Sequence, residues 1–261
     1  MQKLSKRLKA AAAFVSKGSR VADIGTDHGF LPIYLIQSGR CRQAIAMDIR
    51  KGPLMRAQEH IAAAGLEAVI QTRLSDGMQE LQVGEADSIV IAGMGGLTVL
   101  HILEGAKHLQ KDVKELILEP QSDIAKVRKY VREHKMYIDK EDLVYESGKF
   151  YPVLHVVPQE LRMKGAGEDR KQRILQILQE KLTDQERIFS LFDQYGECVI
   201  ANKHPVLSRR LAWERQRECR ILCELEKGGQ QDEGVLLERK KEVLMRLEEI
   251  ELLQELNHGI R

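Results

Sequence analysis

The sequence predicts an α/β protein whose mostly parallel sheet ends in an antiparallel hairpin and is followed by a helical domain. Short apolar runs alternate with helical segments over residues 19–134, as in a sheet whose strands are covered by helices on both faces. Two extended runs then meet at Ser147-Gly148-Lys149, which is a hairpin signal. From residue 162 onward Leu, Glu, Lys, Arg and Gln dominate, which is typical of helices.

The composition is that of an ordinary globular chain. Its 261 residues are 43% hydrophobic and 31% charged, a length for one or two domains with a real core. No apolar run approaches the ~18 residues of a membrane span, so we expect no membrane association. The four cysteines form no paired CxxC motif, which favours a reduced, cytoplasmic protein. A net charge of +2 excludes a strongly basic nucleic-acid coat but is compatible with a nucleic-acid enzyme that has one basic face.

Each element of the first domain begins and ends at a recognisable signal. The basic N-terminal stretch is interpreted as an amphipathic helix, because Lys9 interrupts the apolar run that a signal peptide needs. Five buried strands are expected at residues 19–25, 43–49, 68–76, 86–93 and 114–120. Helices are expected at 30–38, 53–64, 97–109 and after Ser122, which can cap the last of them. The hairpin strands are expected at 137–146 and 150–158.

A linker at residues 159–168 is expected to join a domain of residues 1–160 to a helical domain of residues 161–261. Thr183 and Glu186 fit a capping box. A loop near 202–208 and the Gly228-Gly229 pair divide this region into two or three helices, which we expect to form a helical hairpin or small coiled coil. Trp213 is expected to pack between them.

The loop after the first strand, Asp23-Ile24-Gly25-Thr26-Asp27-His28-Gly29, is the first candidate ligand site. Its glycines allow a sharp turn and let backbone N–H groups approach a ligand. It lacks the G-x-G-x-x-G of nicotinamide-binding proteins, and Asp27 would repel a pyrophosphate, so a dehydrogenase is disfavoured. A carboxylate here suits a cationic or zwitterionic ligand. The spacing D-x-G-x-D-x-G resembles motif I of the Rossmann-like S-adenosylmethionine (SAM) methyltransferases.

Three later positions strengthen this reading, because each lies at the carboxyl end of a strand, where open α/β sheets bind ligands. Asp48, at the end of the second strand, can accept both hydroxyls of a ribose, although it could equally be a solvated strand end. Asp76-Gly77 ends the third strand, where an acid can accept from an adenine amino group; a plain turn is the alternative. The fourth strand runs into Ala92-Gly93-Met94-Gly95-Gly96, whose glycines bring the backbone close to another group.

These motifs, with the opening LSKRL, the strand LILEPQ and the hairpin GKFYPVLHV, resemble the TrmK family of bacterial tRNA (adenine(22)-N1)-methyltransferases over about residues 3–158. The resemblance implies a Rossmann-like class I SAM methyltransferase sheet with a C-terminal helical, coiled-coil-like domain. It implies SAM as cofactor, S-adenosylhomocysteine as product, tRNA as partner and a cytoplasmic location. The implied cofactor-binding residues are Asp23, Gly25, Thr26, Asp27, Gly29, Asp48, Ile49, Asp76, Gly77, Ala92 and Gly93. No metal is expected, since Cys219 and Cys223 have no partner that completes a zinc set.

The implied chemistry needs no prior loss of a proton, because N1 of adenine has an in-plane lone pair that can attack the methyl carbon directly. Positive charge then builds on the ring, and Asp27 is the candidate to stabilise it, by contacting the N6 amino group or by holding His28. A structural role for His28 in the turn is an equal alternative. Tyr151 or Phe150 could stack on the base, with core packing favoured for Phe150. The catalytic candidates are Asp27, His28, Met94, Gly95 and Tyr151.

N1 lies on the Watson–Crick edge, so the target adenine must be unpaired or flipped out. Binding of tRNA should depend on phosphate contacts. The substrate-binding candidates are Lys3, Lys6, Arg7, Lys9, Gly96 and Pro120. A second basic group is interpreted as a solvated helix face with acidic partners: Arg209, Arg210, Arg215 and Arg217.

Two other functions stay open at this point. One is a SAM methyltransferase for another substrate, such as rRNA, a protein or a small molecule. The other is a non-catalytic scaffold that binds SAM or RNA. The sequence leaves open whether the C-terminal helices dimerise, and a monomer is the simpler expectation.

Overall fold

The chain divides into two compact units, Met1–Gly165 and Ala166–Arg261. The computed structural model describes residues 4–106, 112–162, 166–227 and 233–258. Lys3 and the Gly228-Gly229 pair therefore lie outside the described residues. No helix in these ranges is long and apolar enough to cross a membrane.

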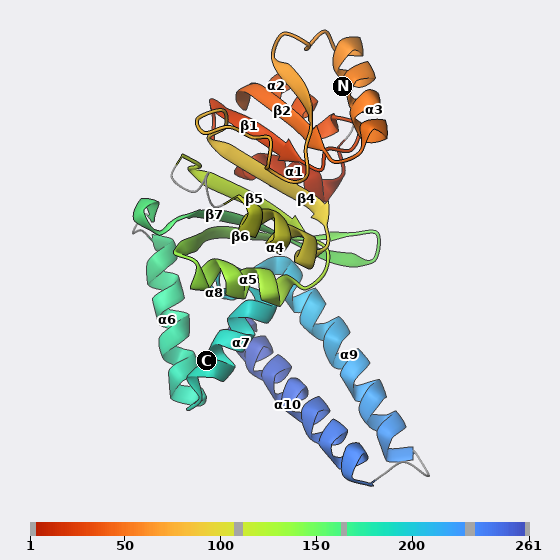
Figure 1. Ribbon diagram of the computed structural model, residues 1–261. Helices are drawn as coiled ribbons and strands as arrows, with labels where there is room; N and C mark the ends of the chain where they lie inside the picture. The colour runs from red at the N-terminus through yellow and green to blue at the C-terminus, as the bar shows by residue number, and fades with distance from the viewer. Residues whose placement is uncertain (1–3, 107–111, 163–165, 228–232, 259–261) are drawn as a thin grey trace. The chain divides into compact units, whose positions relative to one another are not determined.

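The first unit is built on a seven-stranded sheet with the order β3-β2-β1-β4-β5-β7-β6 (Figure 1). The strands are β1 (Ser19–Ile24), β2 (Cys41–Asp48), β3 (Ile70–Leu74), β4 (Ser88–Met94), β5 (Glu115–Pro120), β6 (Met136–Glu146) and β7 (Lys149–Pro158). Strands β1 to β5 are parallel, and β7 pairs antiparallel with both β5 and β6. The predicted parallel sheet with a terminal antiparallel hairpin is confirmed. The hairpin turns at Ser147 and Gly148, whose φ values of 48° and 81° are those of a tight turn between twisted strands.

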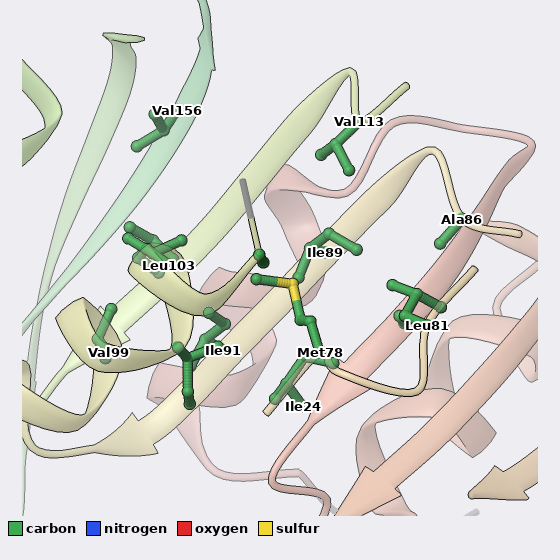
Figure 2. Packing of buried hydrophobic residues seen from close by; sticks show 14 of the residues in the cluster. Ile24, Met78, Leu81, Ala86, Ile89, Ile91, Val99, Leu103, Val113 and Val156 are labelled. Atoms are coloured by element: carbon green, nitrogen blue, oxygen red, sulfur yellow. The ribbon is translucent and has the colours of Figure 1, made fainter. Parts of the chain in front are cut away.

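Helices cover both faces of this sheet, which explains why its inner strands β1, β4 and β5 are largely apolar and buried. The helices are α1 (Lys6–Phe14), α2 (Phe30–Gln37), α3 (Lys51–Ala63), α4 (Gly96–Gly105) and α5 (Ile124–Glu133). Buried residues of α1, α2 and α3 share one cluster with the sheet, and those of α4 and α5 share the other. Figure 2 shows residues of β4 and α4 in the second cluster, among them Ile89, Ile91, Val99 and Leu103.

The strand order reverses between β1 and β4, since β2 lies on one side of β1 and β4 on the other. At such a switch point the loops that follow the two strands diverge toward opposite faces and leave a crevice at their carboxyl ends. The loops after β1 and β4 are the two glycine-rich segments of the sequence, so the fold brings them to the same place.

The second unit contains more helices than the two or three predicted. Its described helices are α6 (Ala166–Lys181), α7 (Gln185–Tyr195), α8 (Glu197–Ala201), α9 (Pro205–Lys227) and α10 (Glu233–His258). The long helices α9 and α10 pack side by side, as the predicted helical hairpin requires (Figure 1). The expected linker is partly structured, with a 3-10 turn at Gln159–Leu161 and α6 beginning at Ala166.

Three local predictions were wrong. Asp123, not Ser122, is the N-cap residue of α5, and the Ser122 hydroxyl instead accepts from the Gly96 N–H at 3.2 Å. Asp184, not Thr183, caps α7 by accepting from the Glu186 N–H at 2.9 Å. Trp213 is 48% exposed, with the Arg217 guanidinium 5.3 Å from its ring centre, so it is not packed between helices.

Candidate active site at the carboxyl ends of the strands

The loop after β1 turns back sharply and is fixed to the neighbouring strand. Gly25 and Thr26 both donate their N–H groups to the Met47 carbonyl at 2.8 Å. Gly25, His28 and Gly29 have φ values of 76°, 62° and 69°, a run of left-handed backbone. For a histidine this conformation is strained, and such strain is concentrated at functional sites. A Cβ on Gly29 would lie 3.2 Å from the Ala57 Cβ, so this glycine allows α3 to pack closely on the loop.

Two buried carboxyl groups lie near the carboxyl ends of the neighbouring strands β1 and β2, close enough for their charges to interact. Asp23 is 5% exposed and Asp48 is 7% exposed. Burial raises the pKa of Asp23 to about 6, with the nearby Asp48 charge adding to the shift and the Thr26 side chain opposing it. Asp48 accepts from the Arg50 N–H at 2.7 Å through one oxygen. Ile49, the next residue, is 59% exposed and offers an apolar surface beside this carboxylate.

The predicted positions after β3 lie farther from the strand than expected. The strand ends at Leu74, and Asp76 is exposed two residues beyond it. Gly77 has a φ of 56°, and a Cβ there would meet the Ile102 side chain of α4 at 3.0 Å. The structural reason for this glycine is therefore the close approach of α4.

The last residues of β4 and the loop that follows make the tightest contacts of this edge. The pairing of β4 with β5 shifts register between Ala92 and Met94, and Gly93 has a φ of 82°. A Cβ on Gly25 would collide with the Met94 methyl carbon Cε, so the two glycine loops touch each other. Gly96 donates its N–H to the Ser122 carbonyl at 3.0 Å, and a Cβ there would collide with that oxygen.

Asp27 and His28 lie at the open side of this edge. The Asp27 side chain is 76% exposed, and its Oδ1 is 3.4 Å from His28 Nε2 and 3.8 Å from Arg56 Nη2. The His28 ring stacks on Phe30 and on His60, with centroids 5.1 and 5.4 Å apart. His60 contacts the His28 carbonyl through Nδ1 at 2.9 Å. The contact between Asp27 and His28 thus exists, and α3 supports it.

Glu119, near the end of β5, was not among the residues predicted from the sequence. It is a third buried acidic residue at this edge, in addition to Asp23 and Asp48. Its carboxylate is fully buried, accepts from the Gly93 N–H at 2.7 Å and forms an ion pair with Arg7 at 2.6 Å. The Arg7 guanidinium lies 5.6 Å from the Tyr151 ring centre. The signal was present in the sequence, since a glutamate interrupts the apolar strand LILEP immediately before its end.

The remaining candidates are divided between this edge and the second unit. Lys6 and Lys9 are exposed on α1, whereas Pro120 is buried and pairs with Met94. Phe150 packs against Tyr145 with centroids 4.9 Å apart. In the second unit the arginines of α9 have acidic partners, in the pairs Arg210–Glu214, Arg215–Glu251 and Arg217–Glu218.

Comparison with known proteins identifies the fold family. Residues 4–154 match the family model described as a methyltransferase domain. The chain belongs to this methyltransferase family. The tRNA (adenine(22)-N(1))-methyltransferase of Bacillus subtilis (strain 168) is 38% identical over 152 residues, which are 58% of this chain and 64% of that relative. The aligned part thus spans less than two thirds of the relative's own length.

Solved structures extend the similarity of this methyltransferase beyond the first unit. The B. subtilis M1A22 tRNA methyltransferase TrmK has a TM-score of 0.77 at 28% identity, covering 98% of this chain and 100% of that one. Streptococcus pneumoniae Sp1610, in complex with S-adenosyl-L-methionine, has a TM-score of 0.76 at 26% identity, covering 97% and 100%. The resemblance to the TrmK family and the expected Rossmann-like methyltransferase sheet are confirmed.

The residues of this methyltransferase fit SAM, which carries a sulfonium and an ammonium beside one carboxylate. Two buried carboxyl groups, Asp23 and Asp48, lie at the edge where a cation would relieve their mutual repulsion. The left-handed glycines of the β1 loop bring no side chain of their own to this position. Asp48 retains a second oxygen that can accept from ribose hydroxyls.

Proposed function

We propose that this protein transfers a methyl group from SAM to N1 of adenine 22 in tRNA. The observation that carries the proposal is the convergence of two glycine loops and two buried carboxyl groups at one strand edge, in a chain whose relatives include a tRNA (adenine(22)-N(1))-methyltransferase. We also propose that residues 1–160 form the catalytic domain and that residues 161–261 contact tRNA. With tRNA as substrate, the cytoplasm is the proposed location.

Bound SAM supplies the methyl group and leaves as S-adenosylhomocysteine. In the proposed site Asp23 faces the cofactor's ammonium group and Asp48 accepts from its ribose hydroxyls. Gly25, Thr26 and Gly29 allow the backbone to approach the cofactor, while Ile49, Asp76 and Gly77 border its adenine. Ala92 and Gly93 form the opposite side.

The target adenine needs orientation more than activation. Its N1 lone pair forms the new N–C bond while the S–C bond breaks and its electron pair remains on sulfur, so the positive charge moves onto the adenine. Met94, Gly95 and Gly96 would shape the slot that holds N1 in line. Asp27, held beside His28, would stabilise the charge that arises on the ring, and Tyr151 would stack on the base.

The decisive experiment supplies the purified protein with isotopically labelled SAM and unmodified bacterial tRNA, followed by nucleoside digestion and mass spectrometry. The expected product is labelled 1-methyladenosine. A tRNA with guanine at position 22 is the matched control and should remain unlabelled. Label in a different nucleoside, or no label while SAM is bound, would contradict the proposal.

A further inference from the structure

Glu119 occupies an unusual position for a charged residue of this fold. It is the penultimate residue of β5 and its side chain is fully buried, and one carboxylate oxygen, Oε2, accepts from both the Gly93 N–H and the Arg7 guanidinium. Burial raises the pKa of this carboxyl, and Arg7 and the Gly93 N–H oppose the shift. A buried ion pair adds little to stability compared with apolar residues of the same size, so stability alone does not explain why it is here.

The Glu119 hydrogen bond fixes the bend of the β4 loop. Gly93 has left-handed backbone at the point where the β4–β5 register shifts, and its N–H is held by the carboxylate instead of by the sheet. The next residue, Met94, places its methyl carbon where a Cβ on Gly25 would be. The Met94 side chain therefore joins the bend at Gly93 to the loop after β1.

Arg7 connects this bend to α1 and to the hairpin. Its guanidinium lies over the Tyr151 ring and within 3.5 Å of the position a Gly93 Cβ would take. The start of α1 is also tied to β6, because the Lys6 N–H donates to Glu146 at 2.8 Å. One guanidinium thus contacts groups on three separate parts of the site.

We propose that Arg7 and Glu119 form a positioning pair that holds the Gly93–Met94 bend against the Gly25 loop and aligns the slot for methyl transfer. The inference rests on the proposed function. It assigns to Arg7 an internal contact in addition to the exposed phosphate contact expected from its place in a basic helix. The pair should set kcat, because a slot misaligned by a fraction of an ångström loses rate more than affinity.

The test compares Glu119→Gln, which preserves side-chain size, and Arg7→Gln, which shortens the side chain and removes its charge, with their double variant. We expect each single variant to lower kcat at least about 10-fold while the SAM Kd from calorimetry stays within about 2-fold. The double variant should be no more than about 2-fold worse than the poorer single variant, since both changes break one contact. Arg20→Gln is the control: it breaks the Arg20–Asp87 pair at the opposite end of β1 and should leave kcat unchanged.

A second readout does not depend on activity. In protein labelled with 13C-methyl methionine, the Met94 methyl resonance, assigned with Met94→Leu, should shift in Glu119→Gln and Arg7→Gln but not in Arg20→Gln. Unchanged kcat with an unmoved Met94 resonance would overturn the inference, and so would losses of kcat matched by equal losses of SAM affinity. If the wild-type protein methylates no tRNA, the proposed function fails, and the Met94 resonance alone decides whether the pair positions the bend. If Glu119→Gln does not fold, Arg7→Gln carries the test.

Discussion

Asp23 is buried at the end of β1, and its pKa is raised to about 6, chiefly by the loss of solvation. The folded-state pKa lies above the ordinary value of 3.8, so this group's contribution to the stability of the unliganded protein is lost as the pH rises through about 6. Binding of SAM should have the opposite dependence, because its ammonium group favours the ionised carboxylate. Affinity for SAM should therefore fall as the pH drops below about 6.

Calorimetry in two buffers of different ionisation enthalpy checks this prediction. We expect proton release on SAM binding near pH 6 and almost none near pH 8, with the release abolished in Asp23→Asn. Equal affinity and no proton release on either side of pH 6 would remove Asp23 from the cofactor site.

A second prediction for a single residue concerns the effect of Asp27 on methyl transfer. Its side chain is 76% exposed, so Asp27→Asn should preserve the fold and the melting temperature. The variant loses the negative charge beside His28, and we expect methyl transfer in single-turnover assays to fall about 100-fold. Asp112→Asn changes another exposed carboxylate before β5 and should have no effect. Wild-type activity in Asp27→Asn would exclude a charge-stabilising role.

At the scale of elements, the first unit was predictable because its signals are local. Strands β1, β2, β4 and β5 are largely apolar runs that stop at or beside a glycine, a proline or an acid, and each of these stops is also where the chain must turn toward a helix. The glycine loops were found for the same reason, since left-handed backbone at Gly25, Gly29 and Gly93 requires this residue type.

Two kinds of contact could not be predicted from the sequence. Some join residues far apart in the chain, and others depend on which of two adjacent residues caps a helix. Arg7 and Glu119 are 112 residues apart, and only the sheet brings them together. The sequence predicts Ser122 as a cap, but its hydroxyl accepts from the Gly96 N–H, so α5 begins at Ile124 with Asp123 as an N-cap residue that makes no side-chain capping bond. In the second unit, charged and apolar residues continue through several short breaks, which hid the ends of α7 and α8.

The close packing at the start of α4 predicts how a substitution there changes the stability of the protein. A Cβ on Gly96 would collide with the Ser122 carbonyl, which is backbone and cannot rotate away. Gly96→Ala should therefore push α4 from the β5–α5 connection and destabilise the protein by about 1–3 kcal/mol. Thermal denaturation measures the loss. Gly105→Ala, at the other end of α4, meets no atom of the described residues within 4 Å and should be neutral or slightly stabilising. Equal melting temperatures for the two variants would contradict this account.

At the scale of the whole molecule, the chain combines a unit that holds every proposed cofactor contact with a helical unit of balanced charge. Residues 166–261 have 17 basic and 19 acidic side chains, so the second unit has no strong net attraction for nucleic acid. One of its arginines is nevertheless available. Arg215 is 51% exposed in its ion pair with Glu251, which is 57% exposed, and such surface pairs are weak enough for a phosphate group to compete for the guanidinium.

Truncation after residue 165 separates the two roles. The first unit has its own core and all the proposed cofactor residues, so it should bind SAM within about 2-fold of the full chain. Its affinity for tRNA should fall about 10-fold at low salt, with a shallower dependence on salt concentration because phosphate contacts are lost. The full-length variant Arg215→Gln should reproduce part of that shallower dependence while its circular dichroism stays unchanged. If the truncated chain instead methylates tRNA with the kcat/KM of the full protein, the helical unit makes no productive contact with the substrate, and Arg215 serves only to pair α9 with Glu251 of α10.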